Sequence, residues 1–187
     1  MKKGLVVIGA IVGVIIIIIG FFAAGYNSLV AKQTIVSQKA ADIDTQLQRR
    51  ADLIPNLINT VKAFTDHENE VFSEVTQARE HLMAASSMAE KSEADQEVTS
   101  ALNKLIAIAE SYPELKSDTV YVDLMDELAG TENRISYARQ EYNAAVTDYN
   151  MATRTFPGVF FANMFGFEKE ELFEAKDGAD EVPEVTF

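Results

Sequence analysis

An uninterrupted apolar stretch near the N-terminus constrains this chain more than any other feature. The eighteen residues of Leu5–Phe22 (LVVIGAIVGVIIIIIGFF) are all apolar or glycine, and no charged residue lies between Lys3 and Lys32. A helix needs about 20 such residues to cross the hydrocarbon core of a bilayer. The stretch has no polar face, which argues against a buried helix of a water-soluble domain. The sequence therefore predicts a transmembrane helix within residues 1–25.

A cleaved signal peptide is the alternative interpretation of this stretch. Signal peptides carry an apolar region of about 7–15 residues, which is shorter than the region found here. Ala23, Ala24 and Gly25 do supply small residues of the kind at which a signal peptidase cuts. The length of the apolar region favours an uncleaved, single-pass anchor in the cell membrane.

The positive charges beside the apolar stretch indicate its orientation. Lys2, Lys3 and the amino terminus precede it, whereas Lys32 and Lys39 follow it. This small excess on the N-terminal side favours a cytoplasmic N-terminus, with the large domain outside the cytoplasm.

Two glycines in the predicted anchor are relevant to whether it pairs with another transmembrane helix. Gly9 and Gly13 form a GxxxG motif, which lets transmembrane helices approach closely. Glycine is common in membrane helices, so the motif alone predicts no oligomer. We expect the lipid bilayer to be a partner, with a homo-oligomer or a membrane protein as further candidates.

Apolar residues recur in alternating steps of four and three residues through most of the remaining chain. A period near 3.5 indicates helices that bury one stripe, whereas a strand would alternate every second residue. In the first series twelve of fourteen positions are apolar: Val36, Ala40, Ile43, Leu47, Arg50, Ile54, Leu57, Val61, Phe64, Glu68, Val71, Val75, Ala78 and Leu82. The second series is Tyr121, Leu124, Leu128, Thr131, Ile135, Ala138, Tyr142, Ala145, Tyr149, Ala152 and Phe156. The sequence therefore predicts an all-α fold.

Two helix arrangements agree with the first series. The segment Thr65–Glu68 (TDHE) has a capping-box pattern that would start a new helix after a turn. The unbroken series instead favours one helix from Tyr26 to Leu82. The lengths of the predicted helices favour the turn. With a turn, four helices run up and down, and the last returns beside the first. We predict an antiparallel up-and-down bundle over residues 26–167, with four helices favoured and three as the alternative.

A shorter helical series lies between the two long ones. Its apolar positions are Val98, Leu102, Leu105, Ile106 and Ala109. We expect Ser92 to cap its start and the segment before Pro113 to end it.

Charge and composition exclude several functions. The net charge is −13 without a basic stripe, and affinity for nucleic acid comes mostly from neutralising phosphates, so we expect no nucleic-acid partner. The chain has no cysteine, which excludes disulfides, thiolate nucleophiles and zinc–thiolate sites. Eight acids against Lys169 and Lys176 make residues 168–187 an acidic C-terminal tail.

Two charged positions interrupt the first apolar series. Arg50 occupies one of them beside Arg49, and Glu68 occupies the other. An arginine lays its methylenes on a core and keeps its charge at the edge. We expect both arginines to pair with acids of the last helix, such as Glu132, Glu141 or Asp148; a site for an anionic ligand is the alternative. Glu68 is expected to cap the turn or to pair with Arg134 or Arg139.

Pro55 lies inside the first predicted helix and is followed by Asn56. Proline has no amide hydrogen and crowds the carbonyl four residues earlier, at Ala51, which kinks a helix or costs about 3 kcal/mol. We expect a bend that keeps the helix against its neighbours; a freed carbonyl used for binding is the alternative. Pro55 and Asn56 therefore join the two arginines and Glu68 as candidate interaction or structural residues.

The dipeptide Tyr–Asn occurs twice in the last predicted helix, at Tyr142–Asn143 and at Tyr149–Asn150, and also at Tyr26–Asn27. Seven residues are about two helical turns, so both tyrosines of the last helix face one way. Because buried tyrosine hydroxyls require partners, we expect a polar-tipped aromatic core that joins the anchor to the bundle.

The segment Phe156–Phe173 holds six of the eleven phenylalanines. Pro157 and Gly158 are expected to end the last helix, because neither residue continues a helix well. We expect the following residues, among them Phe160, Phe161 and Phe165, to pack as a short helix on the bundle or on another subunit. Insertion into the membrane interface is the alternative, which the acidic character of the segment disfavours.

Catalytic motifs are missing from the sequence. His67 and His81 lie fourteen residues apart, which is about 21 Å along one helix, so they would not share a metal. Neither stands in an HExxH or a Glu-x-x-His pattern, and no GxSxG, GxGxxG or phosphate loop occurs. We therefore predict that the protein is not an enzyme and holds no metal or cofactor.

Taken together, several motifs resemble the LemA family over nearly the whole chain except the acidic tail. They follow an N-terminal span in this order: YNSLV (Tyr26–Val30), IDTQLQRRADLIPNLINTVKAF (Ile43–Phe64), HENEVFSEVTQAR (His67–Arg79), ESYPELK (Glu110–Lys116), TENRISYARQEYNAAVTDYN (Thr131–Asn150) and FPGVFFANMFGFEKEELF (Phe156–Phe173). The resemblance implies a membrane-anchored bacterial protein with an antiparallel helical bundle. It implies no settled biochemical activity; family members are regarded as accessories of membrane processes, including proteolysis and organelle membranes.

These observations lead to one hypothesis and two alternatives. We expect a non-enzymatic interaction or scaffold protein that acts through bundle surfaces on a membrane partner. A homo-oligomer that organises membrane is the first alternative, motivated by the GxxxG motif and the aromatic segment. An enzyme of unknown chemistry is the second.

Overall fold

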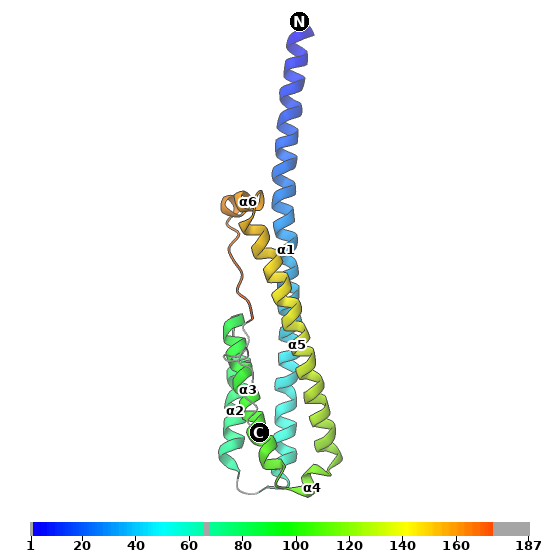
Figure 1. Cartoon of the computed structure of the whole chain (residues 1–187), viewed down its shortest axis with the longest axis vertical. Coiled ribbons are helices and arrows are strands. Elements are labelled where there is room, and N and C mark those ends of the chain that lie inside the picture. Colours follow the sequence, from blue (N-terminus) through cyan, green and yellow to red (C-terminus); the bar gives the residue numbers. More distant parts are fainter. Residues whose placement is uncertain (1, 66–67, 174–187) are drawn as a thin grey trace, which may run out of the picture. The chain divides into compact units, whose positions relative to one another are not determined.

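The computed structural model describes residues 2–65 and 68–173. In this part of the chain it contains six helices and no strand, which confirms the all-α prediction (Figure 1). His67 and residues 174–187 of the acidic tail lie outside the described residues. The chain divides into two compact units. We name Met1–Gln38 with Ala144–Glu170 the anchor unit, and Lys39–Asn143 with Glu171–Phe187 the bundle unit.

The first helix, α1, runs from Lys2 to Lys62 and contributes to both units. Its N-terminal part is the segment of the described chain that is long and apolar enough to cross a membrane, with a mean hydropathy of 2.7 in its most apolar window and none of that window buried. By length and composition a signal sequence passes the same test. The isoleucines of this part, Ile15 to Ile19 among them, are exposed and are not covered by other described residues of the chain.

A turn separates α1 from α2 (Asn69–Ala84), so the arrangement with a turn is the one observed. The capping box expected at Thr65 does not form. The Thr65 hydroxyl donates instead to the carbonyl of Val61 at 3.2 Å, and Glu68 occupies the N-cap position without a capping side-chain bond. Positions of the first apolar series are buried on both sides of the turn, among them Val61 and Val75. The series therefore continues across the turn without a change of register.

In the bundle unit, the C-terminal part of α1, helices α2 and α3 (Met88–Ala109) and the N-terminal part of α5 (Thr119–Arg154) form the core (Figure 1). The short helix α4 (Pro113–Lys116) lies between α3 and α5. Most buried apolar side chains of the bundle unit belong to the predicted series: Ile43, Leu47, Ile54, Leu57, Val61, Val75, Ala78, Leu82, Val98, Leu102, Leu105, Ala109, Tyr121, Leu128, Ile135, Ala138 and Tyr142. Others are buried at positions outside the series, namely Ala51, Ile58, Phe72, Ala94, Ala101, Leu115 and Phe173.

Helix α3 begins earlier than the sequence suggested. Ser87, not Ser92, is its N-cap: the Ser87 hydroxyl accepts from the Glu90 amide, and the Glu90 carboxylate accepts from the Ser87 amide. The hydrogen bonds that the Glu90 carboxylate accepts from the amide and hydroxyl of Ser86 and from the Ser87 amide hold the pKa of Glu90 below its usual range. Ser92 is buried inside the helix. The correct start carries a capping-box signature, Ser-x-x-Glu, at residues 87–90.

Helix α5 ends at Arg154, and α6 spans Gly158–Phe165. The second apolar series was expected to include Phe156, but this residue follows the end of α5 and is 87% exposed. Only glycine fits at the start of α6, because a Cβ on Gly158 would overlap the carbonyl oxygen of Ala152. Gly166, with φ of +75°, ends α6 in the left-handed conformation that glycine adopts without steric cost.

Pro55 leaves a carbonyl without its helical donor, and α2 supplies a replacement. Helix α1 continues through Pro55 to Lys62. The carbonyl of Ala51 lacks the amide hydrogen that residue 55 would normally provide. The Arg79 Nε donates to this carbonyl at 2.8 Å. The proline thus creates an acceptor that ties α1 to α2.

This arrangement predicts that the two substitutions are coupled. Arg79→Met should lower the free energy of unfolding by about 1–3 kcal/mol, because it leaves the Ala51 carbonyl without a donor. In a Pro55→Ala background the amide of residue 55 replaces Arg79, so the same change should cost less than about 1 kcal/mol. Urea unfolding of the four proteins in mild detergent, followed by circular dichroism, measures both losses. Equal losses in the two backgrounds would contradict the assignment.

Candidate functional site

Arg50 lies at the centre of a buried group of charges in the bundle unit. Its Nη1 lies 2.7 Å from Asp95 Oδ1 and 2.9 Å from Glu132 Oε2, and its Nη2 donates to Thr99 Oγ1 at 3.0 Å. Arg139 of α5 pairs with the other oxygen of Asp95, which is only 1% exposed. One carboxylate therefore joins arginines of α1 and α5 through α3.

The sequence analysis named Glu132 as a partner of Arg50 but missed Asp95. A signal was present, because Asp95 stands three residues before Val98 and so continues the apolar series of α3 backwards. Placing the helix start at Ser92 concealed this register. A carboxylate at a core position of one helix, opposite an arginine at a core position of another, is the pattern that indicates such a pair.

The other predicted charge pairs are arranged differently. Arg49 pairs with Glu127. Glu141 pairs with Lys39 in the bundle unit at 3.1 Å, and Asp148 pairs with Lys32 in the anchor unit at 3.4 Å.

The expected pairing of Glu68 with Arg134 or Arg139 is wrong, since these arginines pair with Glu127 and Asp95. Asn56 is exposed, and its backbone carbonyl accepts from the Thr60 hydroxyl.

The two Tyr–Asn pairs of α5 bind the chain that follows α6. In the bundle unit, Asn143 donates to the carbonyl of Phe173 at 3.0 Å and accepts from its amide at 2.8 Å. Tyr142 donates to the carbonyl of Glu171 at 2.9 Å. In the anchor unit, Asn150 makes the same two bonds to Glu170, at 2.8 and 2.9 Å.

The spacing of these asparagines explains the repeat. Seven helical residues rise about 10.5 Å, and three residues of extended chain span about 10 Å. Asn143 and Asn150, seven apart on α5, therefore match Phe173 and Glu170, three apart on the following segment. Each side-chain amide satisfies both backbone groups of one residue, which a segment without regular structure cannot satisfy itself.

Of the tyrosines in the two Tyr–Asn pairs of α5, Tyr142 forms a hydrogen bond, whereas the Tyr149 hydroxyl forms none with the described residues. Tyr149 is fully buried in the anchor unit. Burial raises the pKa of this hydroxyl, and the nearby Glu170 and Glu168 raise it further. The expected polar-tipped core is thus met by Tyr142 and not by Tyr149.

Helix α6 of the phenylalanine-rich segment packs on α1 inside the anchor unit. Phe161 is buried against Leu29 and Phe22, with its ring 5.7 Å from that of Phe22. Phe160 and Phe165 belong to the same helix but are exposed. This segment was expected to pack on the bundle or on another subunit. Its helix α6 contacts residues 21–29 of α1 in the anchor unit, whereas Phe173 at its end is buried and bonded to Asn143 in the bundle unit.

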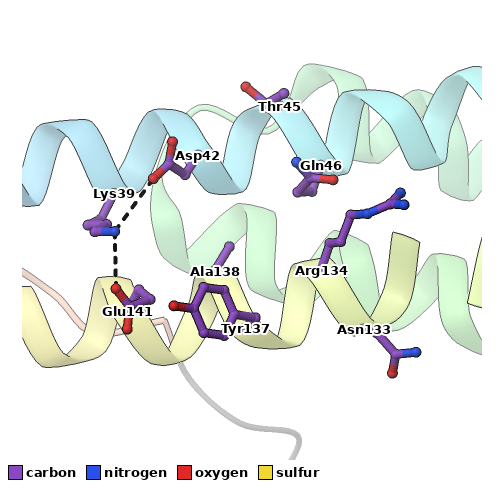
Figure 2. Close-up of a pocket in the computed structure, with 9 residues that line it drawn as sticks. All are labelled: Lys39, Asp42, Thr45, Gln46, Asn133, Arg134, Tyr137, Ala138 and Glu141. Carbon is purple, nitrogen blue, oxygen red and sulfur yellow. Dashed lines mark ion pairs between the residues drawn. The ribbon is translucent and has the colours of Figure 1, made fainter. Parts of the chain in front are cut away.

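A groove of about 440 Å³ lies between α1 and α5 in the bundle unit (Figure 2). Its lining side chains come from α1 (Lys39, Asp42, Thr45 and Gln46) and from α5 (Asn133, Arg134, Tyr137, Ala138 and Glu141). Lys39 bridges the two helices at one end, where it pairs with both Asp42 and Glu141. The hydrogen bond to Glu141 raises the pKa of Lys39, and the charges of Glu141 and Asp42 add to this effect.

Away from Lys39 the groove offers groups that are less fully engaged. The Gln46 Oε1 is shielded from water and has no hydrogen-bond partner among the described residues. Arg134 approaches Glu127 only to 3.8 Å, with its side chain half exposed. The Tyr137 ring is 65% exposed. The groove can therefore hold an anion at Arg134 and stack a side chain on Tyr137.

Known proteins agree with the resemblance noted in the sequence. The model of the LemA family matches residues 39–187. The chain is 25% identical to the magnetosome protein MamQ of Magnetospirillum gryphiswaldense over 83% of its own length and 66% of the relative. It is 26% identical to Protein LemA of Metamycoplasma hominis, over 87% of this chain and 76% of that protein. The chain thus spans slightly less than two thirds of the MamQ length.

The buried charges make a stability prediction. Asp95→Ala should lower the free energy of unfolding by about 3–5 kcal/mol, because it leaves Arg50 and Arg139 without their shared carboxylate. Glu74→Ala, which breaks the exposed pair with Lys104, should cost less than about 1 kcal/mol. Urea unfolding of both variants and the parent chain compares them. Similar losses in the two variants would show that the Asp95 carboxylate has no special role.

Proposed function

The chain belongs to the LemA family, and from this premise we propose that it is a membrane-anchored interaction protein whose helical bundle holds a membrane protein partner in the α1–α5 groove. The observation that carries the proposal is the groove itself, with the loosely engaged cation of Arg134 and the exposed Tyr137 on its α5 side. The apolar part of α1 supplies the anchor, and the bundle lies outside the cytoplasm.

The lining residues favour binding over catalysis. A hydrolytic or transfer site requires a nucleophile beside a base, or a metal. Lys39 is neutralised by Asp42 and Glu141, and within residues 8–65 and 68–173 no three acidic or histidine side chains are grouped as metal ligands would be. These features support a role of the groove in binding a partner.

The groove favours a peptide segment of defined chemistry. An acidic side chain of the partner pairs with Arg134, whose side chain is half exposed. An apolar or aromatic side chain of the partner stacks on Tyr137, a residue type that contributes strongly at interfaces. The shared Asp95 carboxylate ties α1 and α5 to α3 at residues next to the groove, namely Arg50 and Arg139. Preorganised walls lower the entropic cost of binding.

A homo-oligomer that organises membrane is the second candidate. The observation in its favour is the open face at Gly9 and Gly13, where an added Cβ would meet nothing within 4 Å. Such a face lets a second anchor approach closely. In this case the partner of the anchor is another copy of the chain.

A photo-crosslinking amino acid at Tyr137 tests the proposal in intact cells. We expect adducts with a membrane protein that disappear when Arg134→Glu is added, because the reversed charge repels the acidic side chain of the partner. Lys116→Glu makes the same charge change at an exposed residue of α4, outside the groove, and should leave the adducts unchanged.

Two differently tagged copies of the chain decide between the candidates in the same cells. Adducts that contain both tags identify a homo-oligomer. Adducts that persist in the Arg134→Glu protein, or no adduct at all, would contradict recognition through the groove.

A further inference from the structure

Helix α6 carries no charged side chain and presents two apolar faces. Its inward face, Phe161 and Ala162, is buried with Leu29 of α1. Its outward face consists of Phe160, Met164 and Phe165, which are 48%, 50% and 44% exposed. Phe156, in the turn that leads into α6, is exposed as well. An apolar patch of this kind on a protein surface marks a site of contact with a partner or a membrane.

Gly25 fixes where α6 lies along α1. A Cβ on this residue would overlap the ring of Phe161, so the ring rests directly on the α1 backbone. The Phe161 ring also lies 5.3 Å from that of Phe21, and the Phe165 ring lies 5.0 Å from that of Tyr26. The contacts thus cover residues 21–26, where the uncharged apolar stretch of α1 ends.

This position is the boundary of the bilayer if the apolar stretch spans it. Aromatic side chains gather at the membrane–water boundary, where their rings sit at the level of the headgroups. Phe21, Phe22 and Tyr26 of α1 occupy that level, and α6 adds its exposed phenylalanines beside them. The outward face of α6 is therefore continuous with the lipid-facing surface of α1.

We propose that α6 is a second membrane-contact element, whose outward face of Phe156, Phe160, Met164 and Phe165 enters the headgroup–acyl boundary of the leaflet nearest the bundle. The occupant of this face is lipid. The inference rests on the anchoring of α1 stated above and is independent of the partner held in the α1–α5 groove.

The lack of lysine and arginine on α6 is compatible with this assignment because of where α6 is held. A free interfacial helix gains affinity from cations that attract anionic lipids. Helix α6 is held at the membrane by its contacts with α1, so its effective concentration at the lipid surface is already high. It needs only apolar side chains at the correct level.

Single tryptophans test the proposal, because the chain contains none. The full chain is reconstituted in phosphatidylcholine and phosphatidylglycerol vesicles that contain lipids brominated near the headgroup. Phe160 and Met164 are 48% and 50% exposed, and Phe160→Trp keeps an aromatic ring against Phe22, so neither change should disturb folding. Each should be quenched at least about twofold more than Tyr137→Trp, because an interfacial helix lies about 5–10 Å into the boundary. Quenching no stronger than that of Tyr137→Trp would overturn the proposal.

Two further measurements separate the alternatives. Ile15→Trp reports on the anchor and should be quenched by lipids brominated near the chain ends. If Ile15→Trp is quenched and both α6 variants are not, the proposal for α6 fails while the anchor stands; an unquenched Ile15→Trp overturns both. Blue-shifted emission from α6 that disappears on dilution of protein in lipid, without quenching, assigns the face to a second copy and also overturns the proposal.

Discussion

Helix α1 is the constraint on which the rest of the structure depends. A single ladder of backbone hydrogen bonds runs from Lys2 to Lys62, while the side chains along it change from apolar on every side to apolar on one stripe. The first pattern suits a helix surrounded by lipid, where every backbone group must form its hydrogen bond within the segment. The second pattern suits a helix that packs in water. Helix α6 covers the point at which one pattern gives way to the other, next to Gly25.

The polar interruptions of the core are resolved by specific partners. Pro55 frees the carbonyl of Ala51, and Arg79 binds it. Arg50 enters the core, and Asp95 and Glu132 neutralise it. Such buried charges contribute little net stability, because the loss of hydration offsets their attraction. Their value is in alignment: a shift of α1 against α3 by one turn would separate Arg50 from Asp95 and leave both charges buried without a partner.

Periodicity and composition predicted the broad architecture, and local chemistry explains what they missed. The apolar stretch and the two long series identified the candidate membrane span and the helices. The turn after Lys62 could not be decided from the series alone, because Val61 and Val75 keep one register on both sides of it. The start of α3 at Ser87 was not predicted, although the sequence contains its capping-box pattern. The asparagine contacts to Glu170 and Phe173 were beyond prediction, since their partner is irregular backbone without a sequence period. The groove is formed by two helices that are distant in the sequence, so no local sequence pattern predicts it.

The account requires that one polypeptide contain both the membrane span and the bundle. The most direct measurement is the mass of the protein recovered from cell membranes after alkaline extraction, which removes proteins that do not span the bilayer. The account predicts a full-length chain that stays with the membranes and begins at its original N-terminus. A chain released into the supernatant, or one shortened near Ala23–Gly25, would contradict it.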